Sequence, residues 1–503
     1  MANSEKLSKG LNDKTKRTII TTVIIAVLVL CVVGYFVYIT GAIQRTLSGV
    51  KIVETVNEKQ TTVESISILE VSYHYKSILN MYTSQGYNID PEAIFDDATG
   101  KTIQDTLVES AAQELLDDVI IGRAAAADAS FVSGADRYDE MSMETLYTSA
   151  TRYGYQTTDQ FLQAIYGGGM TLRQYRNFLA RETVHDEYFY FLQQFILMPT
   201  ADEIYAAYEA DPDSYDKVDF NFYYYPAETN EDGTVNEDSL AECIEKAQSV
   251  ADAATSSESF REAVMATLEE DESSLSAFDD DNDPTLCEAY TSTSAGYFAE
   301  GFTDFLFGET EDFETTVIET ESGAYALMLV KRYQDETPTA TYRTLTLSQE
   351  EGMTRDELMA EAQAIAAQIT DELSFNNLVK ANADLQEEIL IGGYTTGVTA
   401  PEEPEETEGD EDTADTAATE LSAQEQQLNA WLFDPVRTKG DVIIIPSDIG
   451  TSVTIYYFLD CSASWYCSAR TNLINEAQTE WSNNIMLTNP TYLIDYKSIE
   501  AFL

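Results

Sequence analysis

The first pattern along the chain is an uninterrupted apolar stretch. Residues 18–39 contain no charged side chain, and a helix of about 20 such residues crosses a hydrocarbon core of about 30 Å. The stretch ends in the aromatic residues Tyr35, Phe36 and Tyr38, which is typical of a membrane interface and unlike the small-residue cleavage site of a signal peptide. The pattern therefore predicts a single, uncleaved transmembrane helix over residues 18–40.

A helical period follows over residues 50–212. Apolar residues recur three or four positions apart, which places them on one face of a helix. Two such runs are Ile68, Val71, Tyr75 and Ile78, and Leu107, Ala111, Leu115 and Val119. Shorter helical stretches cover 141–153 and 159–166, and a long one rich in aromatic residues covers 171–197. The sequence predicts an all-helical unit over residues 50–212.

At Val218 the chain changes to β-branched and aromatic runs that predict strands between the helices. Residues 217–334 predict a strand, two helices, a short helix and two strands joined by a turn. The same order recurs over residues 340–461, in which residues 392–399 are predicted to form a loop. We expect an approximate internal repeat of about 120 residues, followed by a C-terminal helix and tail over residues 466–503.

Charge divides the chain at the apolar stretch. The sequence has 28 Lys+Arg against 89 Asp+Glu, a net charge of −61, and so anionic a field repels nucleic acid. The excess of Lys and Arg over acidic residues in residues 1–17 predicts that this end is cytoplasmic and that the rest is extracytoplasmic. Residues 401–420 carry acidic residues and no basic one, which predicts a disordered acidic insertion. We expect a single-pass protein of the cell membrane that binds no nucleic acid.

Cysteine and metal chemistry are sparse. Cys461 and Cys467 form the most local pair and are the candidate disulfide, although free thiols fit the sequence equally well. The acidic residues of 279–283 imitate the start of a calcium loop, but Pro284 occupies the position that needs glycine. The chain has no nucleotide-binding or serine hydrolase motif. We therefore expect no metal site and no cofactor.

The most specific stretch is GYFAEGFTDFLFGETEDFETTVIETESGAYALMLV, residues 296–330, in which glycines separate a short helix from a hairpin. This order resembles parvulin-type prolyl isomerase domains, and the whole chain resembles bacterial envelope foldases of the SurA/PrsA type. The resemblance implies that residues 50–212 are a SurA N-terminal-like chaperone domain. The implied fold is α+β and multidomain, with a transmembrane helix, an all-helical chaperone-like domain, two tandem parvulin-like α+β domains and a C-terminal helix.

The resemblance does not extend to the usual catalytic residues. Parvulin-type domains usually have one histidine on the first strand and one on the last. The two histidines of this chain are His74 and His185, both in the helical unit. We therefore assign no catalytic residue. Prolyl isomerisation is a twisting of the amide bond that a fitted pocket can promote without acid–base chemistry, so enzymatic activity stays open.

Aromatic residues supply the candidate peptide-binding surface. The candidates are Phe298, Phe302, Phe305, Met328, Tyr188 and Phe191. The first four lie in the first α+β unit, where they fit either a residual proline pocket or ordinary core. The last two lie on the long aromatic helix, where an exposed apolar surface would hold unfolded segments. The alternative is that they pack against the C-terminal helix, where Trp481 offers a partner.

Three functions remain open from the sequence. The resemblance favours a membrane-anchored extracytoplasmic chaperone or foldase that binds unfolded exported polypeptides, with degenerate isomerase domains. The second function is an active peptidyl-prolyl cis–trans isomerase. The third is a non-catalytic cell-envelope scaffold that holds one partner.

Overall fold

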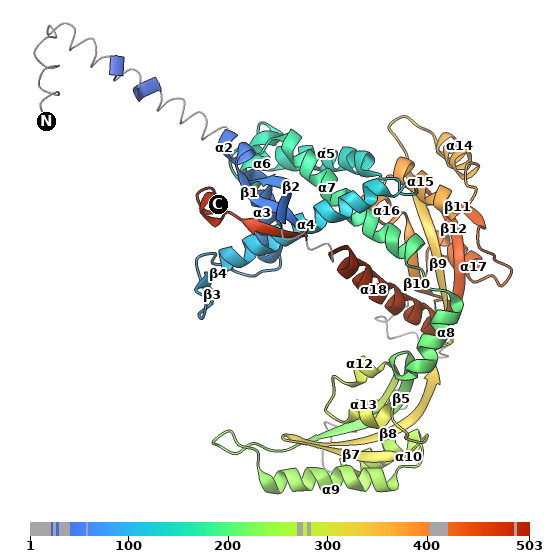
Figure 1. Ribbon diagram of the computed structural model, residues 1–503. Helices are drawn as coiled ribbons and strands as arrows, with labels where there is room; N and C mark the ends of the chain where they lie inside the picture. Colours follow the sequence, from blue (N-terminus) through green and yellow to red (C-terminus); the bar gives the residue numbers. More distant parts are fainter. Residues whose placement is uncertain are drawn as a thin grey trace, which may run out of the picture.

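The protein has a mixed α+β architecture with small antiparallel sheets (Figure 1). The computed structural model describes residues 22–23, 27–29, 41–56, 59–268, 275–278, 283–401, 421–486 and 490–503. Four predicted segments lie wholly or mostly outside these ranges: the basic segment 1–17, the membrane segment 18–40, residues 279–282 of the acidic stretch and the insertion 401–420. Within the described ranges, no helix combines the length and apolar character needed to cross a membrane.

The first unit contains a sheet, so the prediction that residues 50–212 are all-helical is wrong. The sheet consists of β1 (Ser48–Val56), β2 (Lys59–Ser67) and β13 (Pro490–Ile494), with β1 in the middle. Val50 and Ile52 of β1 and Ile66 of β2 are almost fully buried in one core with α3 and α4. The alternation of buried and exposed residues is a strand period, and a strand from the far end of the chain completes the sheet.

Helices make up most of the rest of this unit. They are α2 (Ala42–Thr46), α3 (Ile68–Ser84), α4 (Ile103–Ala127), α5 (Ala135–Arg152), α6 (Thr158–Tyr166), α7 (Leu172–Phe191) and α8 (Ala201–Ala210), with a π-helical turn η1 (Leu192–Ile196), a 3₁₀ turn η2 (Pro212–Ser214) and a small hairpin of β3 (Ile94–Asp96) and β4 (Lys101–Thr102). Thr102 and Asp105 form a reciprocal capping box that fixes the start of α4. α4 packs against both α3 and α7.

The two α+β units contain the same four-stranded antiparallel sheet. The first unit consists of β5 (Asp216–Pro226), α9 (Glu237–Ala253), α10 (Ser257–Thr267), β6 (Leu286–Tyr290), α12 (Ser292–Ala295), α13 (Phe302–Leu306), β7 (Thr315–Thr320) and β8 (Gly323–Gln334). The second consists of β9 (Pro338–Ser348), α14 (Arg355–Ala366), α15 (Glu372–Asn382), α16 (Gln386–Ile391), β10 (Tyr394–Thr399), α17 (Ala423–Leu432), β11 (Val442–Pro446) and β12 (Ser452–Ala463). The strand orders β6-β5-β8-β7 and β10-β9-β12-β11 correspond strand by strand.

The correspondence extends to a bulge between the two central strands. In β5 the pairing shifts after Asp219, the fourth residue of the strand, and in β9 it shifts after Thr341, again the fourth residue. On the partner strands the residue left unpaired is Val330 in β8 and Leu459 in β12, in each case the eighth residue. A bulge at the same register in both sheets agrees with the internal repeat expected from the sequence.

Residues 394–399 form strand β10, so the prediction of a loop at 392–399 is wrong. Gly392 and Gly393 both have a positive φ, and Gly393 comes so close to β9 that a Cβ atom would lie 1.9 Å from the carbonyl oxygen of Thr344. The N–H of Thr344 donates to the carbonyl of Gly393 at 2.8 Å. Only glycine permits this approach. In the sequence the two glycines suggest a loop, but in the structure they lead directly into the edge strand β10.

The helical unit and the second α+β unit meet through buried ionic groups. Lys380 of α15 lies 3.1 Å from the carboxylate of Glu187 on α7, and both side chains are buried. The fully buried Arg343 of β9 pairs with Glu372 at 2.9 Å and donates to the side chain of Gln194 in η1 at 2.8 Å. Charges removed from water this completely are stable only when they are paired, so these contacts fix η1 against the sheet.

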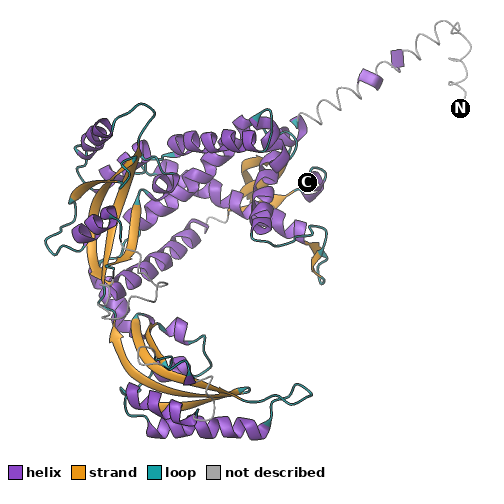
Figure 2. Cartoon of the chain, turned by 180° about the vertical axis from the view of Figure 1, so that it is seen from behind, coloured by secondary structure: helices purple, strands orange, loops and turns teal. Residues whose placement is uncertain are grey.

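The C-terminal helix α18 (Ser464–Met486) runs from the second α+β unit back along η1, and α19 (Tyr496–Glu500) packs near β1. Seen from both sides, the first α+β unit extends away from the other two units (Figures 1 and 2). It is joined to them by α8, which packs against α18, and by the short link between β8 and β9. Its sheet packs against α9 and α10 on one side and against α12 and α13 on the other.

Candidate functional site

One side of the first α+β sheet carries a continuous group of rings, which we call the aromatic face. Its members are Phe222 and Tyr224 of β5, Phe298 between α12 and α13, Phe302 of α13 and Tyr325 of β8. The ring centroids of Phe222 and Phe298 lie 4.7 Å apart, and those of Tyr224 and Tyr325 lie 4.5 Å apart. Phe302 is fully buried and the others are half-buried, so the face combines a packed base with edges that reach solvent.

Local sequence explains how these rings converge. Alternate residues of a strand share one side of the sheet, which places Phe222 and Tyr224 together. Gly301 has φ of 95° and caps α13 in a left-handed conformation that glycine adopts without strain. The Tyr325 hydroxyl lies 3.5 Å from the carbonyl of Phe298, which ties the segment before α13 to the sheet. Tyr297, the neighbouring residue, is 84% exposed.

The structure brings together three of the four residues predicted in this unit. Phe298, Phe302 and Phe305 lie in one cluster, where Phe302 is fully buried and the other two are half-buried. Met328 lies in a different core, with α9 and α10 on the opposite side of the sheet. Met328 is therefore excluded from the aromatic face, because adjacent residues of a strand point to opposite sides.

Tyr188 and Phe191 lie in the core of the helical unit and not on an exposed peptide-binding surface. Both side chains are buried, in a cluster with Phe131 and Trp481. The ring centroids of Tyr188 and Trp481 lie 6.2 Å apart. The alternative interpretation from the sequence, in which these rings pack against the C-terminal helix, describes their environment.

The candidate disulfide between Cys461 and Cys467 is not formed. The cysteines in the described part of the chain, Cys243, Cys287, Cys461 and Cys467, are free thiols. Cys461 is exposed on β12, whereas Cys467 is buried on α18, with its sulfur 3.6 Å from the guanidinium of Arg470. Burial raises the pKa of the Cys467 thiol, so this group stays protonated and unreactive near neutral pH.

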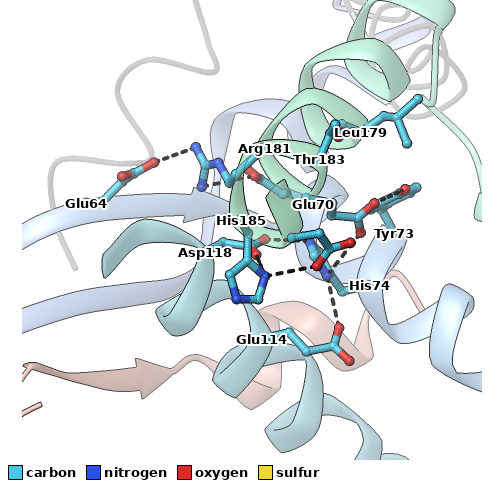
Figure 3. A network of polar contacts seen from close by, with 12 residues as sticks. Glu64, Glu70, Tyr73, His74, Glu114, Asp118, Leu179, Arg181, Thr183 and His185 are labelled. Atoms are coloured by element: carbon cyan, nitrogen blue, oxygen red, sulfur yellow. Dashed lines mark hydrogen bonds and ion pairs between the residues drawn. The ribbon is translucent and has the colours of Figure 1, made fainter. Parts of the chain in front are cut away.

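A second site, which no sequence motif indicated, lies between α3, α4 and α7, and we call it the histidine–carboxylate cleft. Both histidines of the chain converge there on Asp118 of α4 (Figure 3). His74 Nε2 lies 3.8 Å and His185 Nδ1 lies 3.2 Å from the Asp118 carboxylate. His74 Nδ1 also lies 3.1 Å from Glu114 and 3.6 Å from Glu182. Three helices are thus joined by one polar network.

Tyr73 and Arg181 extend this network. The Tyr73 hydroxyl donates to Glu182 at 2.8 Å, and Arg181 lies 2.7 Å from Glu64 and 3.2 Å from Glu70. Figure 3 shows that Arg181 points toward these two glutamates and away from the histidines. In the described ranges, no group of His, Cys, Asp or Glu side chains has an arrangement suited to a metal ion.

Burial and the closeness of several carboxylates raise the pKa values of groups in this network. Burial raises the pKa of Glu182 to about 7, against the opposing effects of His74 and Tyr73. Burial also raises the pKa of Asp186. Desolvation alone would lower the pKa of His74 and of His185, but the surrounding carboxylates outweigh it and raise both values. Each of these groups therefore holds its proton to a higher pH in the folded chain than in the unfolded chain.

We predict that the free energy of unfolding falls as the pH rises from 5 to 8. Groups whose pKa is raised stabilise the folded state while they are protonated: the histidine contribution is complete below about pH 6.5 and is lost above it, and that of Glu182 is lost as the pH passes through about 7. The expected loss is on the order of 2 kcal/mol. Urea unfolding at a series of pH values measures it.

The variant Glu182→Gln provides the control, because a glutamine keeps the size of the side chain and does not titrate. Its unfolding free energy should depend less steeply on pH than that of the parent chain. An unchanged slope in the variant would show that the cleft is not the source of the pH dependence.

Comparison with known proteins finds structural similarity at low sequence identity. No family model matches the chain, and no curated protein matches it. Among solved structures, the chain is similar to the crystal structure of foldase protein PrsA from Streptococcus pneumoniae, with 11% sequence identity and a TM-score of 0.17. That similarity covers 78% of this chain and 89% of the other. The class defined by the fold and the site is an α+β chain with a duplicated four-stranded unit, one copy of which displays an aromatic face.

Proposed function

We propose that the chain is a membrane-anchored extracytoplasmic chaperone of the foldase type that binds unfolded exported polypeptides. The anchor and the compartment rest on the apolar segment 18–40 and the basic residues before it. Binding is reversible and uses apolar side chains of the client, because a chaperone must release what it holds. Its contact surface is the aromatic face of the first α+β unit.

The observation that supports this proposal most is the half-buried state of the aromatic face. Phe222, Phe298 and Tyr325 pack against a buried core, yet they keep solvent-exposed edges. Tyr297 beside them is almost fully exposed. Aromatic rings bury much apolar area at a small cost in side-chain entropy, so such a surface binds many apolar segments without selecting one sequence.

The two copies of the α+β unit have different tasks in this proposal. The second copy is fixed to the helical unit by Arg343 and Lys380. The first copy extends away from that body and is available to clients. Neither His74 nor His185 belongs to either sheet, so the proposal assigns holding of clients, rather than catalysed isomerisation, as the main activity.

Replacing both Tyr297 and Phe298 with alanine is expected to weaken client binding about thirtyfold, because two rings worth about 1 kcal/mol each are removed from the contact surface. The full chain in detergent, at concentrations near that of a chemically unfolded client, should suppress aggregation measured by light scattering. The variant should need a correspondingly higher concentration.

Tyr153→Ala is the matched control, since Tyr153 is an exposed aromatic residue of the helical unit and lies outside the aromatic face. It should suppress aggregation as well as the parent chain. A parent chain that does not suppress aggregation would exclude the proposed function. Strong acceleration of a proline-limited refolding reaction would instead favour an active isomerase, and a single stoichiometric partner on crosslinking in cells would favour a scaffold.

A further inference from the structure

The histidine–carboxylate cleft has an unusual balance of charge for a cavity. It has a volume of about 570 Å³ and is lined by side chains of α3, α4 and α7. Five carboxylates line it, and no Lys or Arg is found among the described lining residues. The five are Glu114, Asp117, Asp118, Glu182 and Asp186. The imidazoles of His74 and His185 are the basic groups that face them, and each is neutral unless it is protonated.

One carboxylate oxygen in this cleft has no hydrogen-bond donor. Asp118 is 3% exposed, and its Oδ1 atom lies 3.2 Å from His185. Its Oδ2 atom is buried and accepts no hydrogen bond, with His74 Nε2 beyond hydrogen-bond distance at 3.8 Å. A buried carboxylate oxygen without a donor costs free energy. A cationic group that entered the cleft would supply the missing donor.

Apolar side chains line the cleft beside the carboxylates. Ile78, Met81 and Tyr82 of α3 line it together with the carboxylates, and Met81 and Tyr82 are exposed. The ring of Tyr87 lies edge-on to that of Tyr82, with centroids 6.1 Å apart, and Tyr87 is exposed as well. Exposed apolar side chains next to carboxylates match a ligand with an aliphatic stem and a cationic end, which is the shape of an arginine or lysine side chain.

We infer that the histidine–carboxylate cleft binds the side chain of an arginine or lysine residue in an extended client polypeptide. The cation reaches the free oxygen of Asp118 and the half-exposed carboxylate of Glu114, while its stem lies along Met81 and Tyr82. The inference rests on the proposed function, since it names a class of client. The chain would then have two binding sites for clients: the cleft on the helical unit, which selects cationic side chains, and the aromatic face, which binds apolar segments of any sequence.

Binding of the cation competes with binding of protons. The charged and titratable groups that face the two histidines come from each surrounding helix. They are Glu70 and Tyr73 on α3, Glu114, Asp117 and Asp118 on α4, and Arg181, Glu182 and Asp186 on α7. At low pH, protonated imidazoles already neutralise Asp118. Cationic clients should therefore bind more tightly at pH 8 than at pH 6.

The test uses two fluorescein-labelled peptides that differ in one side chain. Each peptide has a central apolar triplet flanked by Gly/Ser residues. One peptide carries an arginine at its middle position. The other carries citrulline, a neutral analogue of similar shape, at the same position. Fluorescence anisotropy with the full chain in detergent gives the two dissociation constants. We expect the arginine peptide to bind about tenfold more tightly at pH 8, and this preference to shrink at pH 6.

Two variants test whether the preference for the arginine peptide comes from the cleft. Asp118→Asn removes the buried charge, and Glu114→Gln changes a half-exposed side chain that the fold tolerates more easily. Each should bring the two affinities within about twofold of each other. Glu350→Gln, at an exposed position outside the cleft, should leave the preference intact, and thermal unfolding shows which variants are folded.

The outcomes separate this inference from the proposed function. Equal affinity for the two peptides in the parent chain overturns the inference alone, as does a preference that survives Glu114→Gln in a folded chain. Failure of both peptides to bind overturns the inference together with the proposed function. Loss of the arginine preference on addition of calcium, with calcium bound in the absence of peptide, would assign the cleft to an inorganic cation instead.

Discussion

Replacing Lys380 with methionine is expected to lower the free energy of unfolding by about 3–5 kcal/mol, the usual cost of breaking a buried ion pair from one side. The ammonium group lies 3.1 Å from Glu187, a carboxylate that is fully buried, and donates to the carbonyl of Leu390 at 3.0 Å. Burial lowers the pKa of Lys380 and raises that of Glu187, and the attraction between the two charges opposes both shifts. Urea unfolding followed by tryptophan fluorescence measures the loss.

Two further variants define this effect. Lys246→Met breaks an exposed pair with Glu242 on α9 and should cost less than about 1 kcal/mol. The double variant Lys380→Met with Glu187→Leu should recover much of the lost stability, because two apolar side chains replace two buried charges. If Lys380→Met unfolds at the same urea concentration as the parent chain, the two units are not held together by this pair.

Deleting residues 490–503 is expected to destabilise the helical unit by roughly 5 kcal/mol or more, although these residues lie far from it in the sequence. The deletion removes β13, which pairs with β1 from Pro490 to Ile494. It also removes Ile499, which is buried in the core that contains Val50 and Ile52. Lost backbone hydrogen bonds and newly exposed apolar area add up to a loss of this size. Hydrogen exchange of the β1 amides measures it directly, and these amides should exchange much faster in the deleted chain.

Point variants in β13 show whether the loss comes from packing of this strand. Ile494→Ser changes a side chain that packs against the core and should reproduce part of the effect. Leu493→Ser changes the neighbouring, exposed side chain and should have little effect, because alternate residues of the strand point to opposite sides. Equal effects of the two variants would contradict the observed register.

Much of the α+β architecture follows from local patterns in the sequence. The strands β5, β8, β9 and β12 pack on both faces and are therefore rich in β-branched and aromatic residues, so composition predicts them close to their observed positions. β10 was missed because its glycines, which suggest a loop, are required for close approach to β9. β1 and β2 were missed because their alternation runs directly into the helical period of α3, and the shift from one period to the other leaves no clear boundary.

The candidate sites show the same limit. Phe298 and Phe302 were found because they belong to a local motif, but Met328 was assigned to the same pocket although strand alternation places it on the other side of the sheet. The histidine–carboxylate cleft has no local signal. His74, Asp118 and His185 come from three separate helices, and only the packing of those helices brings both histidines within 4 Å of the Asp118 carboxylate.

The pairing of β1 with β13 also has a consequence for the order in which the protein can mature. A ribosome that adds about 5–20 residues per second makes β13 tens of seconds after β1, and during that interval the middle strand of the first sheet has an open edge. Open edges invite pairing with other chains. The unit that contains β1 can therefore reach its native state only after β13 has been made, and until then the nascent protein itself requires protection from aggregation.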